Sequence, residues 1–304
     1  MPIELIEEPD GTLNSEDFEL DLMITRPNTS TTSCGMNIGS MNDLKDGFEL
    51  FKKYGCKSIG LTCWLPDTNI CFKELPYIEK VRVLRLEFNE KNSSLNLLSQ
   101  SNTAPKCLIE LKLLSEKTIK FNQYHLLNKL KILNVSHQKG SESWMEHEGI
   151  IDLTILKYNH DNLSPLSKMK SLKRLKITQG SLNSLKGIEN LKNLETLHIY
   201  DLKKLISLDS LLKSSSIKNL IFESYTKTFD WDFLSKMKQL RQLNLTTSSS
   251  LKFTSKLPNL IFLHSKKVLD NDRNPELIVE QRADQLNLLG MPLPGFIPLL
   301  DPLE

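Results

Sequence analysis

Alanine is almost absent from this chain of 304 residues, where only Ala104 and Ala283 occur. Alanine is the best helix former, and stacked helices need small residues where their backbones approach closely. A chain with so little alanine is a poor candidate for an array of helix pairs. We therefore expect an architecture that is not all-helical.

Long hydrophobic runs are missing as well, since no apolar run approaches the length of 18 residues or more that would indicate a membrane-spanning helix. The first residues, MPIELIEEPDG, contain neither a basic nor an apolar segment of the kind that begins a secretory signal. The five cysteines are an odd number and fall within the first 107 residues. Together these features predict a cytoplasmic protein with reduced thiols.

Net charge is small, because 39 Lys and Arg residues face 37 Asp and Glu residues. This balance gives no overall indication of a nucleic-acid or acidic partner. Residues 166–218 do carry 11 basic and 4 acidic residues. Many of these lysines fall in predicted turns rather than along one groove, so nucleic-acid binding is kept as an alternative and not as the first interpretation.

Recognisable catalytic and metal-binding patterns are also missing. The chain has no G-x-S-x-G, P-loop or G-x-G-x-x-G motif. Cys56, Cys63 and Cys71 are too far apart for a zinc-binding pair. His137 and His147 lie in HQKGSESWMEHEG, without an HExxH motif, and are predicted to belong to a surface loop. We expect no enzymatic activity, no cofactor and no metal.

Leucine, in contrast, makes up 56 of the 304 residues, and its spacing is regular. The pattern apolar-x-x-apolar-x-apolar recurs ten times, at intervals of 20 to 27 residues. A pattern repeated at this period is typical of a solenoid, in which each round packs on the next. The rounds begin at Cys56, Val81, Leu108, Leu130, Ile150, Leu172, Leu194, Ile217, Leu240 and Leu260.

The LxxLxL pattern at about 22 residues resembles the leucine-rich repeat in its shorter class. The resemblance covers roughly residues 56–266 and implies an α/β solenoid. About ten short parallel strands would line the concave face of an arc, with extended, 3₁₀ or short helical segments on the convex face. Leu175 and Ile177, two residues apart, fit the strand, and the three-residue steps that follow fit the outer segment. The family's Asn, three residues after the pattern, occurs only as Asn89, so we expect irregular turns.

Both flanks are predicted to cap the column of repeats, which would otherwise expose apolar surface at its ends. Residues 18–25 alternate apolar and polar side chains as a strand does, and a helix is expected within 42–54. A second helix is expected near 275–289, followed by a proline-rich tail that either covers the last round or docks on a partner. The predicted domains are an N-terminal cap (1–55), the solenoid (56–266) and a C-terminal cap with its tail (267–304).

The concave face is the predicted functional surface, because it mixes apolar and aromatic side chains with charges, as protein interfaces do. We expect a non-enzymatic module that binds one protein partner there, as an inhibitor or immunity-type protein that masks a toxin or an enzyme. A scaffold or regulatory subunit and an effector that acts in a host cell are the alternatives, and no small-molecule substrate is expected. The predicted contact residues are Arg85, Glu87, Lys112, Leu114, Ile132, Asp152, Leu156, Arg174, Lys176, His198, Tyr200, Ile221, Glu223, Asn244 and Phe262.

Overall fold

The computed structural model divides the chain into two compact units, Met1–Ile150 and Ile151–Glu304, and each is described by itself. The parts of the chain that the structure describes are residues 5–7, 13–15, 20–25, 33–38, 49, 53, 58–65, 70–71, 79, 81–88, 95–96, 105–115, 123–138, 142–223, 229–245 and 252–265.

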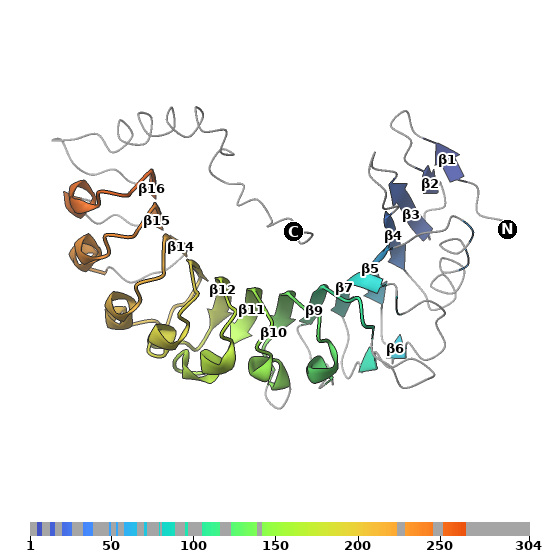
Figure 1. The fold of residues 1–304 in the computed structure, drawn as a ribbon, viewed down its shortest axis with the longest axis horizontal. Coiled ribbons are helices and arrows are strands. Elements are labelled where there is room, and N and C mark those ends of the chain that lie inside the picture. The colour runs from blue at the N-terminus through green and yellow to red at the C-terminus, as the bar shows by residue number, and fades with distance from the viewer. Residues whose placement is uncertain are drawn as a thin grey trace. The chain divides into compact units, whose positions relative to one another are not determined.

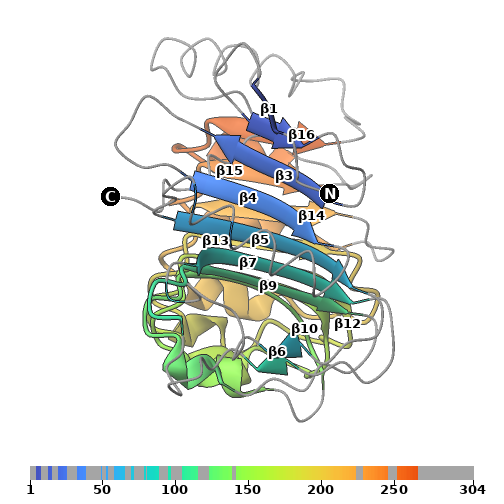
Figure 2. The same ribbon diagram turned by 90° about the vertical axis from the view of Figure 1, so that its right-hand side faces the viewer.

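The first unit contains a sheet in the order β1-β2-β3-β4-β5-β7-β9-β10. Neighbouring strands from β1 to β4 are antiparallel, and those from β4 onward are parallel. Figure 2 shows β3, β4, β5, β7 and β9 side by side. A separate parallel pair joins β6 (Ile70–Cys71) and β8 (Leu95–Asn96). The sheet strands are β1 (Leu5–Glu7), β2 (Leu13–Ser15), β3 (Leu20–Thr25), β4 (Ser33–Ile38), β5 (Ser58–Leu65), β7 (Val81–Phe88), β9 (Glu110–Ser115) and β10 (Ile132–Ser136).

The register of β5 corrects the first round of the predicted ladder. The ladder places Ile59 opposite Leu84, whereas in the structure Leu61 pairs with Leu84 and Cys63 with Leu86. Cys63 therefore takes the repeat position that was assigned to Leu61. The error is a slip of two residues, which leaves every side chain on the same face and so is not revealed by alternation. Parallel pairing also begins one strand earlier than the ladder, since Met36 of β4 pairs with Leu61.

The second unit is a sheet of parallel strands in the order β11-β12-β13-β14-β15-β16. Leucines at equivalent positions pair along it: Leu153 with Leu175, Leu175 with Leu197, and Leu197 with Leu220. The predicted solenoid register is confirmed here. The strands are β11 (Asp152–Tyr158), β12 (Arg174–Gly180), β13 (Thr196–Tyr200), β14 (Asn219–Glu223), β15 (Gln242–Leu245) and β16 (Phe262–Ser265).

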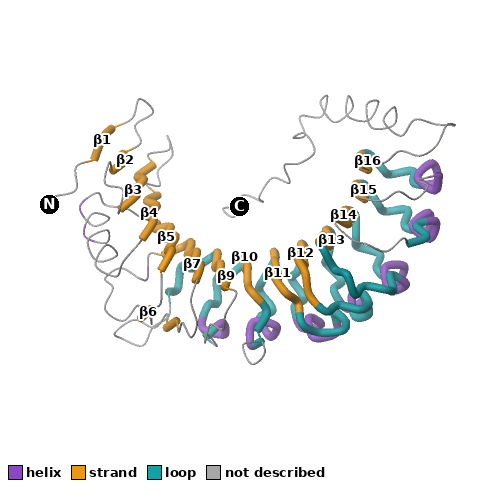
Figure 3. The backbone as a smooth tube through the Cα atoms, turned by 180° about the vertical axis from the view of Figure 1, so that it is seen from behind, coloured by secondary structure: helices purple, strands orange, loops and turns teal. Residues whose placement is uncertain are grey.

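Short 3₁₀ helices connect most of these strands, as the three-residue spacing predicts. In the second unit the 3₁₀ helices lie on the side opposite the strands (Figures 1 and 3). The 3₁₀ helices are η3 (Tyr124–Leu126) and η4 (Ser143–Glu146) in the first unit, and η5 (Ser164–Lys168), η6 (Ile188–Asn190), η7 (Asp209–Lys213), η8 (Asp232–Lys236) and η9 (Lys252–Lys256) in the second.

The core of the second unit is a column of aliphatic side chains between the strands and the 3₁₀ helices. Leu153, Leu197, Leu220 and Leu243 have no exposed surface, and Leu175 keeps 1%. Burial of one leucine contributes about 2 kcal/mol relative to leaving it in water. Because each round adds the same positions, stacking extends a single core along the whole unit.

The strand ends turn sharply, and the structure shows what replaces the missing Asn of the family. Lys157, Gln179 and Asp201 each take a left-handed conformation, with φ of 58°, 61° and 52°. Gly180 follows with φ of 132°, and a Cβ there would lie 2.1 Å from the carbonyl oxygen of Tyr158, so no other residue fits. The buried Tyr158 occupies the family's Asn position and donates its hydroxyl to the carbonyl of Asn162 at 2.9 Å.

Side-chain amides link successive rounds at the turn before each strand. Asn193, Gln239 and Asn259 donate to backbone carbonyl oxygens of the preceding round at 2.8, 3.0 and 2.8 Å. Each of these amides stands one residue before the first apolar position of its round. Such bonds satisfy carbonyls that the sheet does not use, at about 1 kcal/mol each.

Of the elements predicted at the two flanks, some lie within the described residues and others lie outside them. The strand expected in 18–25 is confirmed by β3. Within 42–54 only Glu49 and Lys53 are described, both helical, while the helix near 275–289 and the proline-rich tail are not described. The domain boundaries after residues 55 and 266 remain predictions. Among the described residues, no helix has the length and apolar character needed to cross a bilayer.

Candidate functional site

The sheet face is defined here as the strand side chains that alternate with the buried ones. In the second unit the parallel register arranges them in rows that run across the strands. One row contains Asp152, Arg174, Thr196, Asn219 and Gln242; the next contains Thr154, Lys176, His198, Ile221 and Asn244; a shorter row contains Leu156, Thr178, Tyr200 and Glu223. The sequence predictions for this unit therefore fall on one continuous surface.

An ion pair joins the first two strands of this face. Arg174 donates from Nε to Oδ2 of Asp152 at 2.8 Å, and its Nη2 atom lies 2.7 Å from the same oxygen. Both side chains are largely covered, with 15% and 19% of their surface exposed. A charge-assisted pair in this setting holds both groups in fixed positions.

A second polar cluster spans the next strands. Glu223 interacts through Oε2 with Nε2 of His198 at 3.1 Å. Asn244 donates from Nδ2 to the other carboxylate oxygen of Glu223 at 3.2 Å. One glutamate thus orients both a histidine and an amide, which come from the strands on either side of it.

The surroundings of His198 lower its pKa below the ordinary value of 6.5. Burial is the largest cause, and the positive charge of Lys176 acts in the same direction, while Glu223 acts against both. Lowering by burial and by a like charge indicates that the neutral imidazole is favoured at this position. Lys176 keeps no hydrogen-bond or ion-pair partner within the described part of the chain.

A hollow of about 210 Å³ opens over the first three strands of this unit. Its walls come from both polar rows, and its floor includes the backbone side of the sheet. The lining residues are Asp152, Thr154, Arg174, Leu175, Lys176, Thr196 and His198. Thr196 is nearly buried and accepts a hydrogen bond from Asn219 at 3.0 Å.

An apolar strip borders the hollow toward the ends of the strands. Tyr200 is 37% exposed, an unusual value for a large hydrophobic side chain among the residues that the structure describes. Leu156 and Ile221 are half-buried on the same face. In its own row Tyr200 lies between Thr178 and Glu223, with Leu156 one strand further and Ile221 in the adjacent row. An exposed aromatic ring near aliphatic and fixed polar groups has the composition of a protein-interface centre.

The first unit carries the remaining predicted residues on its own sheet face. Arg85 donates from Nε to Oε1 of Glu110 at 2.7 Å, although 45% of the arginine side chain stays exposed. Lys112, Leu114 and Ile132 are half-buried on neighbouring strands. Glu87 in β7, like Phe262 in β16 of the other unit, is described by its backbone alone.

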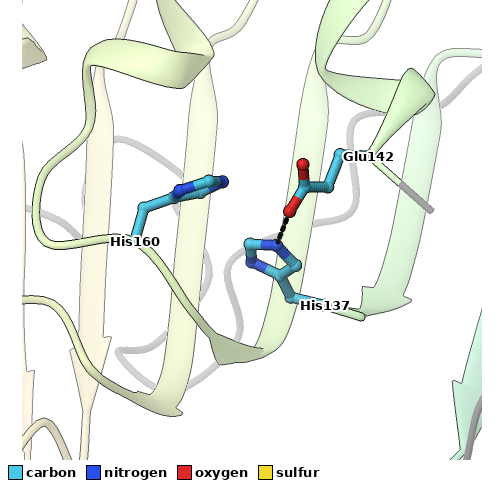
Figure 4. A group of neighbouring side chains, drawn as sticks. All are labelled: His137, Glu142 and His160. Atoms are coloured by element: carbon cyan, nitrogen blue, oxygen red, sulfur yellow. Dashed lines mark hydrogen bonds and ion pairs between the residues drawn. The ribbon is translucent and has the colours of Figure 1, made fainter. Parts of the chain in front are cut away.

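The histidine loop of the first unit is more buried than the sequence predicts. Figure 4 shows His137 beside Glu142, and their Nε2 and Oε1 atoms are 2.9 Å apart. The His137 side chain has no exposed surface and packs edge-on against buried Trp144, with ring centroids 6.0 Å apart. His147 interacts with the carbonyl of Leu127 at 3.1 Å. The expectation of a surface loop is wrong at His137, which packs against the buried Trp144, whereas His147 is half-buried between the exposed Glu146 and Glu148.

The set predicted from the sequence omitted the two threonines of the hollow. Thr154 and Thr196 occupy sheet-face positions that strand alternation predicts, but they were set aside in favour of charged and apolar side chains. Spacing alone places a residue on the face. It does not show that neighbouring side chains leave a hollow above it.

Two solved structures that resemble this chain are internalins from Listeria monocytogenes strain 4b F2365. An internalin (inlF) is 16% identical, with a TM-score of 0.48, and the match covers 81% of this chain and 76% of that one. An internalin C2 (inlC2) is 20% identical, with a TM-score of 0.38, over 53% of this chain and 73% of that one. No protein-family model and no curated protein matches the sequence.

The fold follows from the chain's own register. Strands recur at the leucine period, pair in parallel, and are joined by 3₁₀ helices across a leucine column. In the part of the chain that the structure describes, this is the architecture of a leucine-rich-repeat solenoid.

Proposed function

We propose that the chain is a non-enzymatic binding module, and that its sheet face in the unit Ile151–Glu304 binds one protein partner. The observation that carries this proposal is that polar side chains on the sheet face hold one another in place. Arg174 is held by Asp152, for example, on the same face as the exposed ring of Tyr200. Side chains that are ordered before binding lose little entropy when a partner docks, which favours affinity.

The polar pairs of this face suit recognition better than catalysis. Arg174 forms an ion pair with Asp152, and Glu223 is hydrogen-bonded to His198 and Asn244, so these contacts orient the groups. Catalysis by a nucleophile would require a hydroxyl or thiol within reach of a base that is itself oriented. Among the described residues, His198 is hydrogen-bonded to Glu223 and to no hydroxyl or thiol, so we assign it a binding role.

Our first choice of role is an inhibitor or immunity-type protein that masks a toxin or an enzyme. A masking protein must bind tightly over a continuous surface, and the rows of the sheet face provide such a surface. A scaffold or regulatory subunit and a host-directed effector are the alternatives, and both would use the same face. The activity of the partner distinguishes them, because a masking protein abolishes it at equimolar ratio and a scaffold does not. A cytoplasmic location belongs to this proposal, with Cys107 as a free thiol.

The basic residues counted in the sequence do not favour nucleic acid on this face. Lys168 lies in η5, and Lys186, Lys192, Lys203 and Lys204 lie in turns. All five are exposed and none is a sheet-face residue. Binding of a phosphate backbone would require these lysines to line one continuous track.

A matched pair of variants tests the proposed face. Tyr200 on the sheet face and Leu212 in η7 are 37% and 41% exposed, so their replacement by glutamate perturbs folding similarly. The partner is captured from the native cell by the wild-type chain and then measured against both variants. We expect Y200E to weaken binding by roughly tenfold or more, as loss of an aromatic anchor does, and L212E to leave it unchanged.

The opposite result would place the partner-binding site on another part of the chain. If L212E weakens binding and Y200E does not, the 3₁₀ side of the unit is the interface. If neither variant changes binding, the partner contacts a part of the chain away from both residues. Thermal unfolding of each variant checks that any loss of binding reflects the contact and not the fold.

A further inference from the structure

We propose that the hollow over β11, β12 and β13 receives a carboxylate side chain of the partner protein, so that the partner presents an acidic residue beside an apolar one. This inference rests on the proposed function and adds the chemistry of the partner. It follows from the charges around the hollow, the space within it and the apolar strip at its border.

The charged side chains that line the hollow, Asp152, Arg174 and Lys176, sum to one positive charge while His198 is neutral. On β11 and β12, Asp152 and Arg174 are paired with each other at 2.7 Å. Glu223 of β14 is shared by His198 of β13 and Asn244 of β15. The ammonium group of Lys176 has no such partner among the described residues. The lining of the hollow is therefore positive at Lys176, whereas the negative Glu223 lies outside that lining.

The charge of Lys176 acts on His198, which also lines the hollow, so the electrostatic field of the lysine extends into the hollow. Lys176 and His198 pair across adjacent strands, and the lysine charge helps to lower the pKa of His198. A bound carboxylate would reverse that influence, because a nearby negative charge favours the imidazolium form. The histidine is thus a reporter placed inside the proposed site.

The walls and volume of the hollow suit a carboxylate. Thr154 and Thr196, which carry hydroxyl groups, line it together with the lysine and the histidine. Hydroxyl and ammonium groups are the hydrogen-bond donors that a carboxylate accepts. The volume of about 210 Å³ far exceeds the ~15 Å³ that a single water needs, and it leaves room for a carboxylate with its hydrating waters.

The apolar strip indicates which type of residue accompanies the acidic residue in the partner protein. Tyr200 lies two residues beyond His198, the pairing partner of Lys176. A strand spacing of about 4.8 Å and a two-residue rise of about 6.7 Å place the Lys176 and Tyr200 Cα atoms about 8 Å apart. Residues two apart in an extended partner segment span nearly the same distance. We expect an acidic and an apolar residue at that separation.

Selection of displayed random peptides on the full chain tests this inference. The wild-type chain is expected to enrich peptides that carry Asp or Glu two positions from a large apolar residue. The variant K176E should lose the acidic preference and bind the enriched peptides roughly tenfold more weakly, because like charges now face each other. The matched control K204E changes an exposed lysine in a turn, away from the sheet face, and should keep the preference.

A second measurement uses the reporter and does not depend on a variant that folds. The pKa of His198 is followed by NMR in the wild-type chain, free and with an enriched peptide. The acidic peptide is expected to raise the pKa of His198, and the same peptide with Gln or Asn in place of the acid is expected to leave it unchanged.

Three results would overturn the carboxylate site: enrichment without acidic residues, equal enrichment by K176E, or a His198 pKa that the acidic peptide does not move. Self-association of the chain that K176E abolishes would also overturn it, since the occupant would then be a second copy. The proposed function is judged separately. It survives a failed carboxylate site if Y200E, but not L212E, still weakens peptide or partner binding.

Discussion

At the scale of single residues, the sheet face depends on a few side chains that fix one another. Glu223 bonds both His198 and Asn244, and Asp152 holds Arg174. Removing Glu223 takes a hydrogen-bond partner from both His198 and Asn244, and such a loss at half-buried groups costs more than the bond itself gains. The face should therefore respond to single substitutions at these positions more strongly than its partial exposure suggests.

The titration of His198 measures this arrangement directly. Because burial and Lys176 lower its pKa, K176Q should raise the pKa toward the ordinary value of 6.5. E223Q removes the group that opposes them and should lower the pKa further. NMR titration of the histidine in each variant provides the measurement. Equal values in K176Q, E223Q and the wild type would show that neither charge reaches the imidazole.

The same shift has a consequence for stability. The unfolded chain binds a proton at His198 more readily than the folded chain, because the folded pKa is the lower one. The neutral form therefore contributes stability above the ordinary pKa of histidine, and this contribution is lost as pH falls from that value through the lower pKa of the folded chain.

Sequence reasoning found most of the residues on this face but few of their contacts. Alternation along each strand places Lys176, His198 and Tyr200 on one side, and the 22-residue period aligns them across strands. Neither pattern reveals that Glu223 bonds its two neighbours, or that two threonines open a hollow. Such features depend on side-chain directions across strands, which spacing does not contain.

At the scale of elements, each described round of the second unit pairs a short strand with a 3₁₀ helix. The apolar positions of the helix face the strand, and its charged ends face water. In η7 the two adjacent leucines separate these roles, since Leu211 has no exposed surface and Leu212 is 41% exposed. One leucine builds the column and the other lies outside it.

Replacement of these two leucines by alanine tests the packing of the round. L211A leaves a cavity in the column and should lower the free energy of unfolding by about 2–5 kcal/mol. L212A removes the same atoms from a half-exposed position and should cost under about 1 kcal/mol. Urea denaturation monitored by circular dichroism compares the two. Equal losses would mean that η7 does not cover the leucine column.

Element positions were more predictable than their register. The leucine period located the strands from β7 onward, and the three-residue steps predicted 3₁₀ segments. The slip at β5 arose because Ile59 and Leu61 are both apolar and two apart, so either can fill the same position. Hydrophobic patterns constrain which face a residue takes, whereas backbone pairing decides its exact partner.

At the scale of the whole molecule, the chain contains two compact units, the first with a mixed sheet that is parallel from β4 onward and the second with a parallel sheet. A solenoid is stabilised by contacts between neighbouring rounds, so its exposed face is free to vary without loss of the fold. This separation explains why a leucine column can be recognised from the sequence while the binding partner cannot. The leucine column follows from a hydrophobic pattern that recurs in each round, whereas the choice of partner depends on particular side chains.

The most direct test of the account is hydroxyl-radical footprinting of the chain alone and in complex with its captured partner. The method reports the solvent access of individual side chains, and Tyr200 and Leu212 begin with similar exposure. We predict strong protection of Tyr200 and Ile221 in the complex, with Leu212 and Ile206 labelled as before. Protection of Leu212 and Ile206 with Tyr200 still labelled would contradict the claim that the sheet face binds the partner.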